Sequence, residues 1–368
     1  MKPAGPLISI IVPVHQGART LPHALSAIAD SDLARDAWEL VVVDDASTDD
    51  TAMIAAKYAD CVVRLPGRPH GPAYARNRGV EVSRGAIIAF FDADVIVHPD
   101  ALRRMIDVFM NEADVSAVFG AYDTTPTAPG FVSQYRNLLH HYVHARSAGD
   151  AETFWAGCGA IRRDAFLTAG MYDEWRFTRP QIEDVELGHR LRAHGHRIVL
   201  RPDIQCSHMK RWRLRDVIKA DFNDRGVPWT RLLIQMGAMT RTTTLNLATV
   251  EKLNTVLLAV AVGLLVLGPI FRSPPVALGA VAALAFVIIV NRPLYAFFAR
   301  ERGIFFALGV IPLHMIYYLN NGFAVIYGWL LHHVFGEPAP DALTQAYSEV
   351  GAQMWPPVPS KGGKPAEK

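Results

Sequence analysis

Two neighbouring segments in the C-terminal third of this 368-residue chain carry no charged side chain. Residues 253–271 and 273–291 are each 19 residues long and contain no Asp, Glu, Lys or Arg. Because a helix rises about 1.5 Å per residue, each segment is long enough to cross a hydrocarbon core of about 30 Å. We therefore predict two membrane-spanning helices here, rather than helices buried inside a large soluble domain.

A third apolar segment, residues 303–336, is also uncharged if its three histidines are neutral. As a single helix it would be about 50 Å long, which is too long for a simple span. The polar residues Asn320, Asn321 and Gly322 provide a natural break. We therefore divide the membrane region, residues 251–336, into spans at about 251–271, 274–298 and 303–320 and an interfacial or re-entrant piece at 322–336. The polar tail, residues 337–368, is predicted to be disordered.

Basic residues predict the orientation of this region in the membrane. Arg292, Arg300 and Arg302 follow the second apolar segment, and many Arg and Lys residues between 210 and 241 precede the first. By the positive-inside rule both groups lie in the cytoplasm, whereas the connector at 272–275 lies outside. Residues 7–14 are too short for a signal sequence and are typical of a strand. We expect a multi-pass protein of the cell membrane with a cytoplasmic N-terminal domain.

Charge and cysteine content exclude several classes of protein. The net charge of +2 argues against a nucleic-acid partner, and the basic residues next to the spans suit an anionic membrane surface better. Residues 206–250 are predicted to form basic amphipathic helices lying on that surface. The three cysteines are widely spaced and have no C-x-x-C pattern, so we expect reduced thiols rather than disulfides or a zinc site.

The N-terminal part, residues 1–205, alternates short β-branched runs with helical patterns. Strands are predicted at 7–14, 39–43, 61–65 and 86–91, and helices at 18–30, 49–58 and 72–83. This alternation predicts an α/β fold with a Rossmann-like, mostly parallel sheet flanked by helices. The chain contains neither a G-x-G-x-x-G turn after the first strand nor a P-loop motif. A dinucleotide-dependent dehydrogenase and a P-loop NTPase are therefore disfavoured.

Acidic residues follow two of the predicted strands, at the sheet edge where ligands bind in such folds. Asp45 ends the run at 41–45, and Asp92 and Asp94 follow the apolar run at 86–91. An Asp-x-Asp pair can supply hard oxygen ligands to Mg²⁺ or Mn²⁺ that also holds substrate phosphates. A solvated turn is the simpler interpretation of the pair, and helix capping is the simpler interpretation of Asp45.

Further candidates lie elsewhere in the N-terminal part. Arg76 and Asn77 begin a helix near the same edge of the sheet, although solvated charge explains them equally well. Trp155 can stack on an acceptor, and Gly157 permits close approach of the backbone; core packing is the alternative for both. His140, His141 and His144 share one helix face, but no acid nearby completes a zinc site.

Five motifs in order make the chain resemble the family 2 glycosyltransferases, which have the GT-A fold. The resemblance covers about residues 6–240. The motifs are VPVHQGARTLPHAL, VVVDDASTDDT, GPAYARNRG, FFDADV and IEDVELGHRLRAHG. The resemblance implies an inverting hexosyltransferase that uses a nucleotide-diphosphate sugar, usually a UDP or GDP sugar, together with a divalent metal.

The resemblance also assigns roles to single residues. It implies that Asp45 reads the nucleotide base above a loop containing Pro13 and His15. Asp92 matches the position near the ribose or the metal, and Asp94 matches the principal metal ligand.

For the chemical step, Asp184 matches the general base, and we expect Glu183 to orient it. The residue types agree with this assignment, because inversion needs one carboxylate to take the proton of the attacking hydroxyl. An N-terminal helix cap is the alternative role for Asp184.

His208 lies where many members of the family supply a histidine to the metal or diphosphate. A structural role is equally consistent with a single histidine. Arg211 and Trp212 are similar to the end of the Q-x-x-R-W signature of processive polysaccharide synthases, but no Gln stands at 208 or 209. This difference puts synthesis of long polymers in doubt.

The resulting prediction is a membrane-anchored glycosyltransferase that acts on a lipid-linked or surface glycan acceptor. Two alternatives remain open. One is a membrane scaffold that binds nucleotide sugars without catalysis, against which the acids Asp92, Asp94 and Asp184 count. The other is a sugar-1-phosphate nucleotidyltransferase, which would normally carry a Gly-rich basic loop after the first strand, where this chain has residues 13–18.

Overall fold

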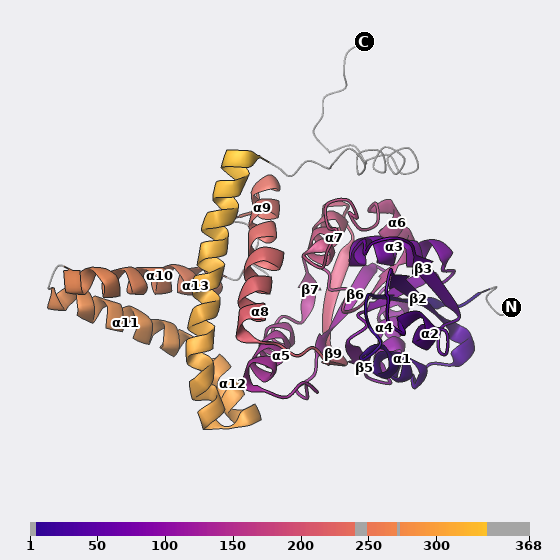
Figure 1. The fold of residues 1–368 in the computed structure, drawn as a ribbon, viewed down its shortest axis with the longest axis horizontal. Helices are drawn as coiled ribbons and strands as arrows, with labels where there is room; N and C mark the ends of the chain where they lie inside the picture. Colours follow the sequence, from indigo (N-terminus) through magenta and orange to yellow (C-terminus); the bar gives the residue numbers. More distant parts are fainter. Residues whose placement is uncertain (1–4, 240–248, 271–272, 337–368) are drawn as a thin grey trace, which may run out of the picture.

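The first strand of the structure shows how the sheet is built. Ile8, Ile10 and Val12 are buried in one hydrophobic core, and Ile11 lies in a second core on the opposite face. Successive side chains of a strand point to opposite faces, so a strand that is apolar throughout must be covered on both sides. A computed structural model describes residues 5–239, 249–270 and 273–336 of the chain, and Figure 1 shows their arrangement.

Nine strands form one sheet in the described part of the chain. They are β1 (Ile8–Val14), β2 (Trp38–Asp45), β3 (Cys61–Leu65), β4 (Ile87–Phe91), β5 (Val95–Val97), β6 (Val115–Tyr122), β7 (Gly149–Ala151), β8 (Cys158–Arg162) and β9 (Arg197–His208). The strand order is β3-β2-β1-β4-β8-β6-β9-β5, and β7 pairs with β9. The first half, β3-β2-β1-β4, is parallel, as predicted. Strand β8 runs antiparallel between β4 and β6, so the sheet as a whole is mixed.

Helices cover both faces of this sheet. The helices of the N-terminal domain are α1 (Leu21–Ala29), α2 (Thr51–Ala55), α3 (Pro72–Val82), α4 (Ala101–Asn111), α5 (Phe131–Ala145), α6 (Arg163–Thr168) and α7 (Glu183–Ala193), with a short 3-10 turn at Arg35–Ala37. Helices α1 and α4 contribute to the first core, and α3, α6 and α7 contribute to the second. The carboxyl ends of the parallel strands remain uncovered by these helices and form the edge at which the predicted site lies.

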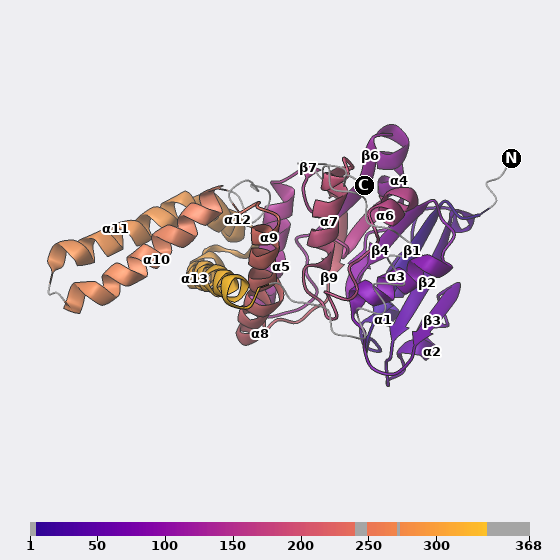
Figure 2. The same cartoon turned by 90° about the horizontal axis from the view of Figure 1, so that it is seen from above.

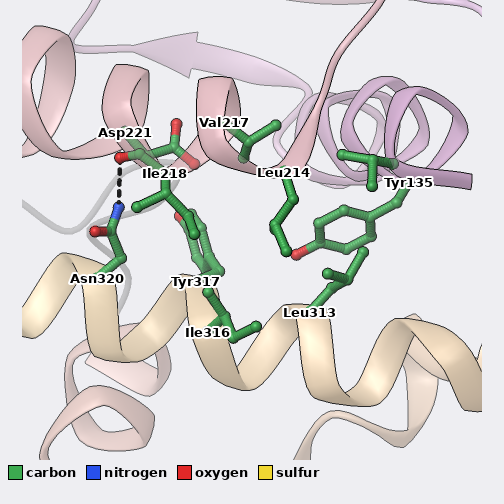
Figure 3. A pocket seen from close by; sticks show the side chains of 10 residues that line it. Tyr135, Leu214, Val217, Ile218, Asp221, Leu313, Ile316, Tyr317 and Asn320 are labelled. Atoms are coloured by element: carbon green, nitrogen blue, oxygen red, sulfur yellow. Dashed lines mark hydrogen bonds between the residues drawn. The ribbon is translucent and has the colours of Figure 1, made fainter.

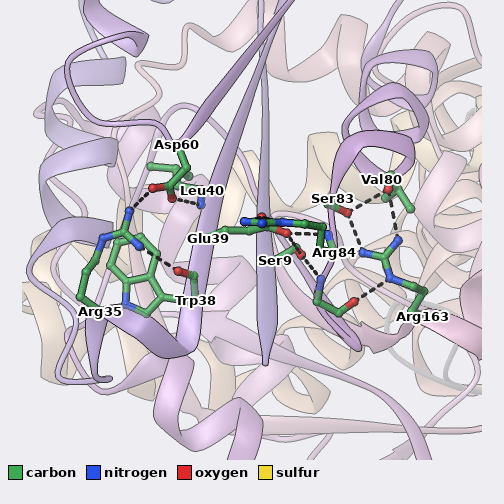
Figure 4. Close-up of polar contacts among 11 residues, drawn as sticks. Ser9, Arg35, Trp38, Glu39, Leu40, Asp60, Val80, Ser83, Arg84 and Arg163 are labelled. Carbon is green, nitrogen blue, oxygen red and sulfur yellow. Dashed lines mark hydrogen bonds and ion pairs between the residues drawn. The ribbon is translucent and has the colours of Figure 1, made fainter. Parts of the chain in front are cut away.

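A buried carboxylate closes the opposite edge of the sheet, at the amino ends of the strands (Figure 4). Glu39 of β2 accepts hydrogen bonds from Ser9 Oγ at 2.7 Å and from Arg84 Nε at 2.9 Å. Burial would raise the pKa of Glu39, but these hydrogen bonds outweigh it and lower the pKa. Ser9 Oγ in turn accepts from the amide of Gly85, where a side chain would collide with the backbone of β1. This network ties β1, β2 and the start of β4 together, away from the site.

The C-terminal helices form a second layer beside the sheet (Figures 1 and 2). Helix α8 (Leu214–Lys219), the π-helix η2 (Ala220–Gly226) and helix α9 (Val227–Gln235) stand between the sheet and the remaining helices. Helices α10 (Thr249–Ile270) and α11 (Pro274–Val290) form a hairpin that extends away from the domain. Helices α12 (Arg292–Arg302) and α13 (Ile304–Phe335) complete the described chain. By length and composition, α10 and α13 are each able to cross a membrane, as is the bent pair formed by α11 and α12.

The structure corrects two details of the predicted membrane region. The segment predicted at 274–298 is two helices, which meet at Asn291 with a bend of 58°. The break predicted at Asn320, Asn321 and Gly322 is absent, because α13 continues through these residues as one helix of 32 residues. The side chain of Asn320 donates a hydrogen bond to the backbone oxygen of Ile218 at 3.1 Å and so connects α13 to α8. The predicted tail at 337–368 and part of the connector at 272–275 lie outside the described residues.

Candidate active site

A cleft of about 790 Å³ lies at the carboxyl ends of the parallel strands. Ten of the twelve residues proposed from the sequence line this cleft. They are Pro13, His15, Asp45, Arg76, Asp92, Asp94, Trp155, Glu183, Asp184 and His208. Asn77 and Gly157 are not among the lining residues. The acids from strand ends and the acids that begin α7, far apart in sequence, are therefore brought to one cavity.

Asp45 connects β2 to the start of α3. Its carboxylate accepts hydrogen bonds from the backbone amides of His70, at 2.9 Å, and Gly71, at 2.8 Å. His15 Nδ1 donates to the backbone oxygen of Asp45 at 2.7 Å, which fixes the loop after β1 against the end of β2. Gly71 has a φ of +98°, and a side chain there would meet the Thr178 backbone oxygen at 2.5 Å. Asp45 thus orders two loops of the cleft and still lines the cavity itself.

Arg76 is buried between two acids that the sequence had placed in separate motifs. Its Nη2 lies 2.8 Å from Asp92 Oδ1, and its Nη1 lies 2.9 Å from Glu183 Oε1. Burial would lower the pKa of Arg76, but the charges of the surrounding acids, Asp92 first, raise it above the ordinary value. The guanidinium therefore stays charged and links the end of β4 to the start of α7. Glu183 is held in position by this contact.

Asn77, the neighbour of Arg76, faces away from the cleft. Its amide donates to the backbone oxygen of Tyr172 at 2.9 Å and to Glu174 at 2.6 Å, and its oxygen accepts from the amide of Tyr172 at 3.1 Å. The residue is 3% exposed. Asn77 therefore holds the segment around Tyr172 against α3 through these hydrogen bonds.

Asp184 has the electrostatics of a general base. Its two carboxylate oxygens accept from the backbone amides of Ala156, at 3.1 Å, and Val185, at 2.8 Å. Burial, followed by repulsion from Glu183, raises the pKa of Asp184 to about 7. A carboxylate with such a pKa takes up a proton far more readily than an ordinary one near neutral pH. The two amides hold its orientation toward the cleft.

Asp94 and His208 form the pair that is best suited to a metal. Asp94 Oδ2 lies 3.5 Å from His208 Nε2 across the pairing of β5 with β9. His208 Nδ1 donates to Asn137 Oδ1 at 2.7 Å, and the ring stacks on Tyr122, so the imidazole is held with Nε2 directed at Asp94. Burial would raise the pKa of Asp94, but the contact with His208 outweighs it and lowers the pKa. One ionised carboxylate and one oriented imidazole fit a divalent metal.

Other metal arrangements find no support in the described residues. No group of three or more His, Cys, Asp and Glu side chains gathers there in a way that could hold an ion. An ion at Asp94 and His208 would therefore complete its coordination with diphosphate oxygens and water. Two of the three histidines that suggested zinc are engaged elsewhere, because His141 and His144 each contact a backbone oxygen of β6. Burial lowers the pKa of His144 to about 4, which keeps it neutral.

Trp155 forms an aromatic wall of the cleft, and Gly157 makes room for it. The Trp155 ring packs near Tyr122, His140 and His144, with ring centroids 4.8 to 5.4 Å apart. A Cβ at position 157 would lie 2.6 Å from the indole ring. The absence of a side chain at Gly157 therefore leaves the space that the Trp155 ring occupies. The ring presents flat apolar surface of the kind on which sugar rings stack.

Three charged residues on the side of the site that faces the C-terminal helices were not identified from the sequence. Arg136 of α5 and Arg225 of η2 line the cleft, and both bind Asp221 Oδ1, at 2.7 Å and 2.9 Å. The pattern offered one weak signal, because Asp221 and Arg225 are four residues apart in a helical segment. Nothing in the sequence indicated that Arg136, 85 residues earlier, shares the same carboxylate.

The fold is that of a GT-A-like domain with a cleft at the carboxyl ends of its parallel strands, and comparison with known proteins agrees with this fold. The sequence pattern of Glycosyl transferase family 2 matches residues 9–168. Residues 9–168 are therefore similar to glycosyl transferase family 2, and the C-terminal helices α10 and α13 are long and apolar enough to cross a membrane.

Individual relatives are similar over part of their length. Validoxylamine A glucosyltransferase of Streptomyces hygroscopicus subsp. jinggangensis is 27% identical over 223 residues, which are 52% of this chain and 52% of that protein. The UDP-Glc:alpha-D-GlcNAc-diphosphoundecaprenol beta-1,3-glucosyltransferase WfgD of Escherichia coli is 30% identical over 119 residues, 32% of this chain and 46% of that protein. The chain thus spans about half the length of the curated relatives it matches.

A solved structure extends the likeness of fold beyond the sheet domain. The mannosyltransferase PcManGT from Pyrobaculum calidifontis, in complex with GDP-Man and Mn²⁺, superposes with a TM-score of 0.53 at 18% identity. The superposition covers 90% of this chain and 88% of that one. Because it covers so much of the chain, the fold likeness includes C-terminal helices as well as the GT-A domain.

Proposed function

We propose that this protein is a membrane-anchored, inverting glycosyltransferase. It transfers a hexose from a UDP or GDP sugar to an acceptor hydroxyl at the membrane, on a lipid-linked or surface glycan. The observation that carries the proposal is Asp184, a carboxylate whose pKa is raised to about 7 in the same cleft as the Asp94 and His208 pair. A base and a diphosphate-binding end in one cavity are the two parts that sugar transfer with inversion needs.

Donor binding follows from the residues at the strand ends. Asp45, His15 and Pro13 line the end of the cleft at β1 and β2, where the nucleotide base is expected. Asp92 reaches the cleft from the end of β4 and is held by Arg76, which suits a contact with the ribose or the ion. A divalent ion, Mn²⁺ or Mg²⁺, bound by Asp94 and His208 would neutralise charge on the departing diphosphate. The PcManGT complex, which contains Mn²⁺ together with GDP-Man, supports the choice of ion.

The chemical step uses residues of the chain directly. Asp184 takes the proton of the acceptor hydroxyl while that oxygen forms a bond to the anomeric carbon. The bond from the anomeric carbon to the diphosphate oxygen breaks on the opposite face, and its electron pair leaves with the diphosphate. Glu183, fixed by Arg76, repels charge on Asp184 and keeps its proton affinity high. The Trp155 wall excludes water on one side of the acceptor.

The acceptor class is suggested by the position of the domain and by one relative. The helices that line the membrane side of the cleft contribute Arg225 and Trp229. WfgD, by its name, acts on a diphosphoundecaprenol-linked sugar. A lipid-linked acceptor would present its hydroxyl at the membrane surface, where this cleft is anchored if the apolar helices span the bilayer.

Purified full-length protein in lipid nanodiscs tests the proposal. We would supply UDP and GDP sugars with Mn²⁺, with Mg²⁺ or with EDTA, add lipid extract as the acceptor source, and analyse products by mass. Metal-dependent transfer or slow donor hydrolysis is expected, and Asp184→Asn should abolish transfer. Asp203→Asn, a substitution in an exposed ion pair between β9 and Arg104 of α4, is the matched control. Binding of a nucleotide sugar without any turnover would instead identify a scaffold.

A further inference from the structure

Helix α13 satisfies the usual criteria for a membrane span, since it has 32 residues and no Asp, Glu, Lys or Arg. Its length, about 48 Å, exceeds the roughly 30 Å of a hydrocarbon core. If α13 crossed the bilayer, its two ends would lie on opposite sides. The contacts made at each end of the helix test that possibility directly.

The N-terminal end of α13 is attached to the catalytic domain. Arg302, two residues before the helix, donates from Nε to Gln134 at 2.9 Å and from Nη2 to the backbone oxygen of Thr124 at 2.7 Å. Within the first turns, Gly309 lies against the ring of Phe131 on α5, where a Cβ would be 2.7 Å from the ring. Because Thr124 and Gln134 belong to the catalytic domain, this end of α13 is on that domain's side of the membrane.

The C-terminal end of α13 is attached to the layer formed by α8, η2 and α9, which stands between α13 and the sheet. Arg231 of α9 donates from Nη2 to the backbone oxygen of Gly336, one residue after the helix. Two turns earlier, a Cβ at Gly328 would lie 2.9 Å from Thr230 of α9, so the two helices are in close contact. Helix α9 contributes Leu232 to the second core of the sheet domain. Both ends of α13 are therefore in contact with one and the same body.

The middle of α13 is also packed against this layer (Figure 3). Leu313, Ile316 and Tyr317 of α13 face Tyr135 of α5 and apolar side chains of α8 around a cavity of about 10 Å³. Asn320 adds a hydrogen bond to α8. The contact thus continues from the first turn of α13 to its last, with no part of the helix separated from the domain.

The layer beneath α13 cannot itself lie in hydrocarbon. It carries charged side chains along its length, among which Arg215 is 78% exposed and Arg225 is 42% exposed. A charged side chain at the bilayer centre costs several kcal/mol. A helix that stays in contact with this layer from end to end must remain at the same depth throughout.

The directions of the helices agree with this conclusion. Helix α13 is seen along its length in Figure 1 and end-on in Figure 2, whereas the hairpin of α10 and α11 lies lengthwise in both views. The hairpin and α13 therefore cross instead of running side by side. If the hairpin enters the bilayer, α13 lies along the membrane surface at its base.

We propose that α13 is an interfacial helix that lies in the membrane plane, and that only the α10 and α11 hairpin crosses the bilayer. The partner of its outer face is the lipid bilayer, since that face presents large apolar side chains at Phe305 (87% exposed), Phe323 (64%) and Val334 (66%). Residue 336 then lies on the same side as the catalytic domain. The inference rests on the proposed membrane location but not on the sugar-transfer chemistry.

Depth measurements with spin labels test the proposal. On full-length protein carrying Cys61→Ala, since Cys158 and Cys206 are buried, single cysteines would replace Phe305, Phe323 and Val334. Spin labels at these cysteines in nanodiscs should report one shallow depth. In the same background, labels replacing Val256 and Leu267 of α10 should differ in depth by about 16 Å, the rise of 11 helical residues. A label at position 323 near the bilayer centre, with 305 and 334 on opposite sides, would overturn the proposal.

A topology measurement gives an independent answer that does not depend on the labelled variants. Reporter domains fused after residue 368 and before residue 1 should both face the side of the catalytic domain. A cysteine introduced at Ser273, at the tip of the hairpin, should react with an impermeant thiol reagent only from the opposite side. A C-terminal reporter on that opposite side would refute the proposal, as would protection of position 273 there. Neither readout requires activity, so failure of the proposed function remains distinguishable.

Discussion

Replacement of Asp184 by Asn tests the site most directly, because the structure fixes both a kinetic and a thermodynamic consequence. With a pKa of about 7, Asp184 is ionised in only about 10% of molecules at pH 6 and in about 90% at pH 8. The profile of kcat/KM against pH should therefore fall on its acidic side with a midpoint near pH 7. Asp184→Asn should lower kcat by about 10²- to 10⁴-fold, the usual contribution of a general base.

The same raised pKa weakens the fold as the pH increases. The pKa of Asp184 is raised from 3.8 in the unfolded chain to about 7 in the folded chain, so its protonated form favours folding at low pH. That contribution is complete below about pH 4 and is lost as the pH rises to about 7. Relative to wild type, Asp184→Asn should gain about 2 kcal/mol in unfolding free energy between pH 5 and pH 7, from about 1.4 kcal/mol per pH unit.

The comparison between two pH values removes terms that do not titrate. Asn offers one carbonyl oxygen where Asp184 accepts from both Ala156 and Val185, so the variant loses a hydrogen bond at every pH. Urea unfolding of metal-free, full-length protein in detergent measures the difference. Asp173→Asn is the control, since burial raises the pKa of Asp173 to about 6 but this residue does not line the cleft.

The control separates pH-dependent stability from pH-dependent catalysis. Asp173→Asn should alter the pH dependence of stability and leave the acidic limb of kcat/KM in place. The assignment of Asp184 as base is refuted if the wild-type limb has its midpoint below pH 5. It is also refuted if Asp184→Asn turns over donor and acceptor at the wild-type rate.

Two further substitutions address the rest of the cleft. Arg76→Gln leaves Asp92 and Glu183 without their shared cation, so it should destabilise the protein by about 3 kcal/mol in urea unfolding, while Arg76→Lys should recover part of this loss. Equal stability of wild type and Arg76→Gln would show that the ion pairs are dispensable. Asp94→Asn removes the ionised partner of His208, so it should weaken Mn²⁺ binding at least tenfold in calorimetry, and unchanged Mn²⁺ affinity would place the ion elsewhere.

Local sequence patterns were sufficient for the parallel half of the sheet and for the acids at its edge. Runs such as 86–91 are apolar at every position because both faces of the strand are buried, and the following Asp92 and Asp94 must then emerge at the strand end. The antiparallel strand β8 and its place between β4 and β6 could not be predicted, since strand pairing across long separations has no local signature.

The interactions that connect the site were not predictable for the same reason. Arg76 contacts Glu183 across 107 residues, and His208 contacts Asn137 across 71 residues. A polar residue read in isolation does not reveal its partner. The Asn320 region shows the opposite error, because a polar cluster in an apolar run was interpreted as a break, although packing against α8 satisfies it within a continuous helix.

The placement of α13 also bears on how an acceptor reaches Asp184. Helix α9 stands between α13 and the sheet (Figure 1), and it contributes Trp229 to the cleft. The side of the cleft that α9 forms therefore lies next to α13. If α13 lies at the depth of the lipid headgroups, the cleft opens just above them. A lipid-linked sugar would then meet the base without leaving the bilayer. Arg136 and Arg225, which share the single carboxylate of Asp221, leave net positive charge on its path.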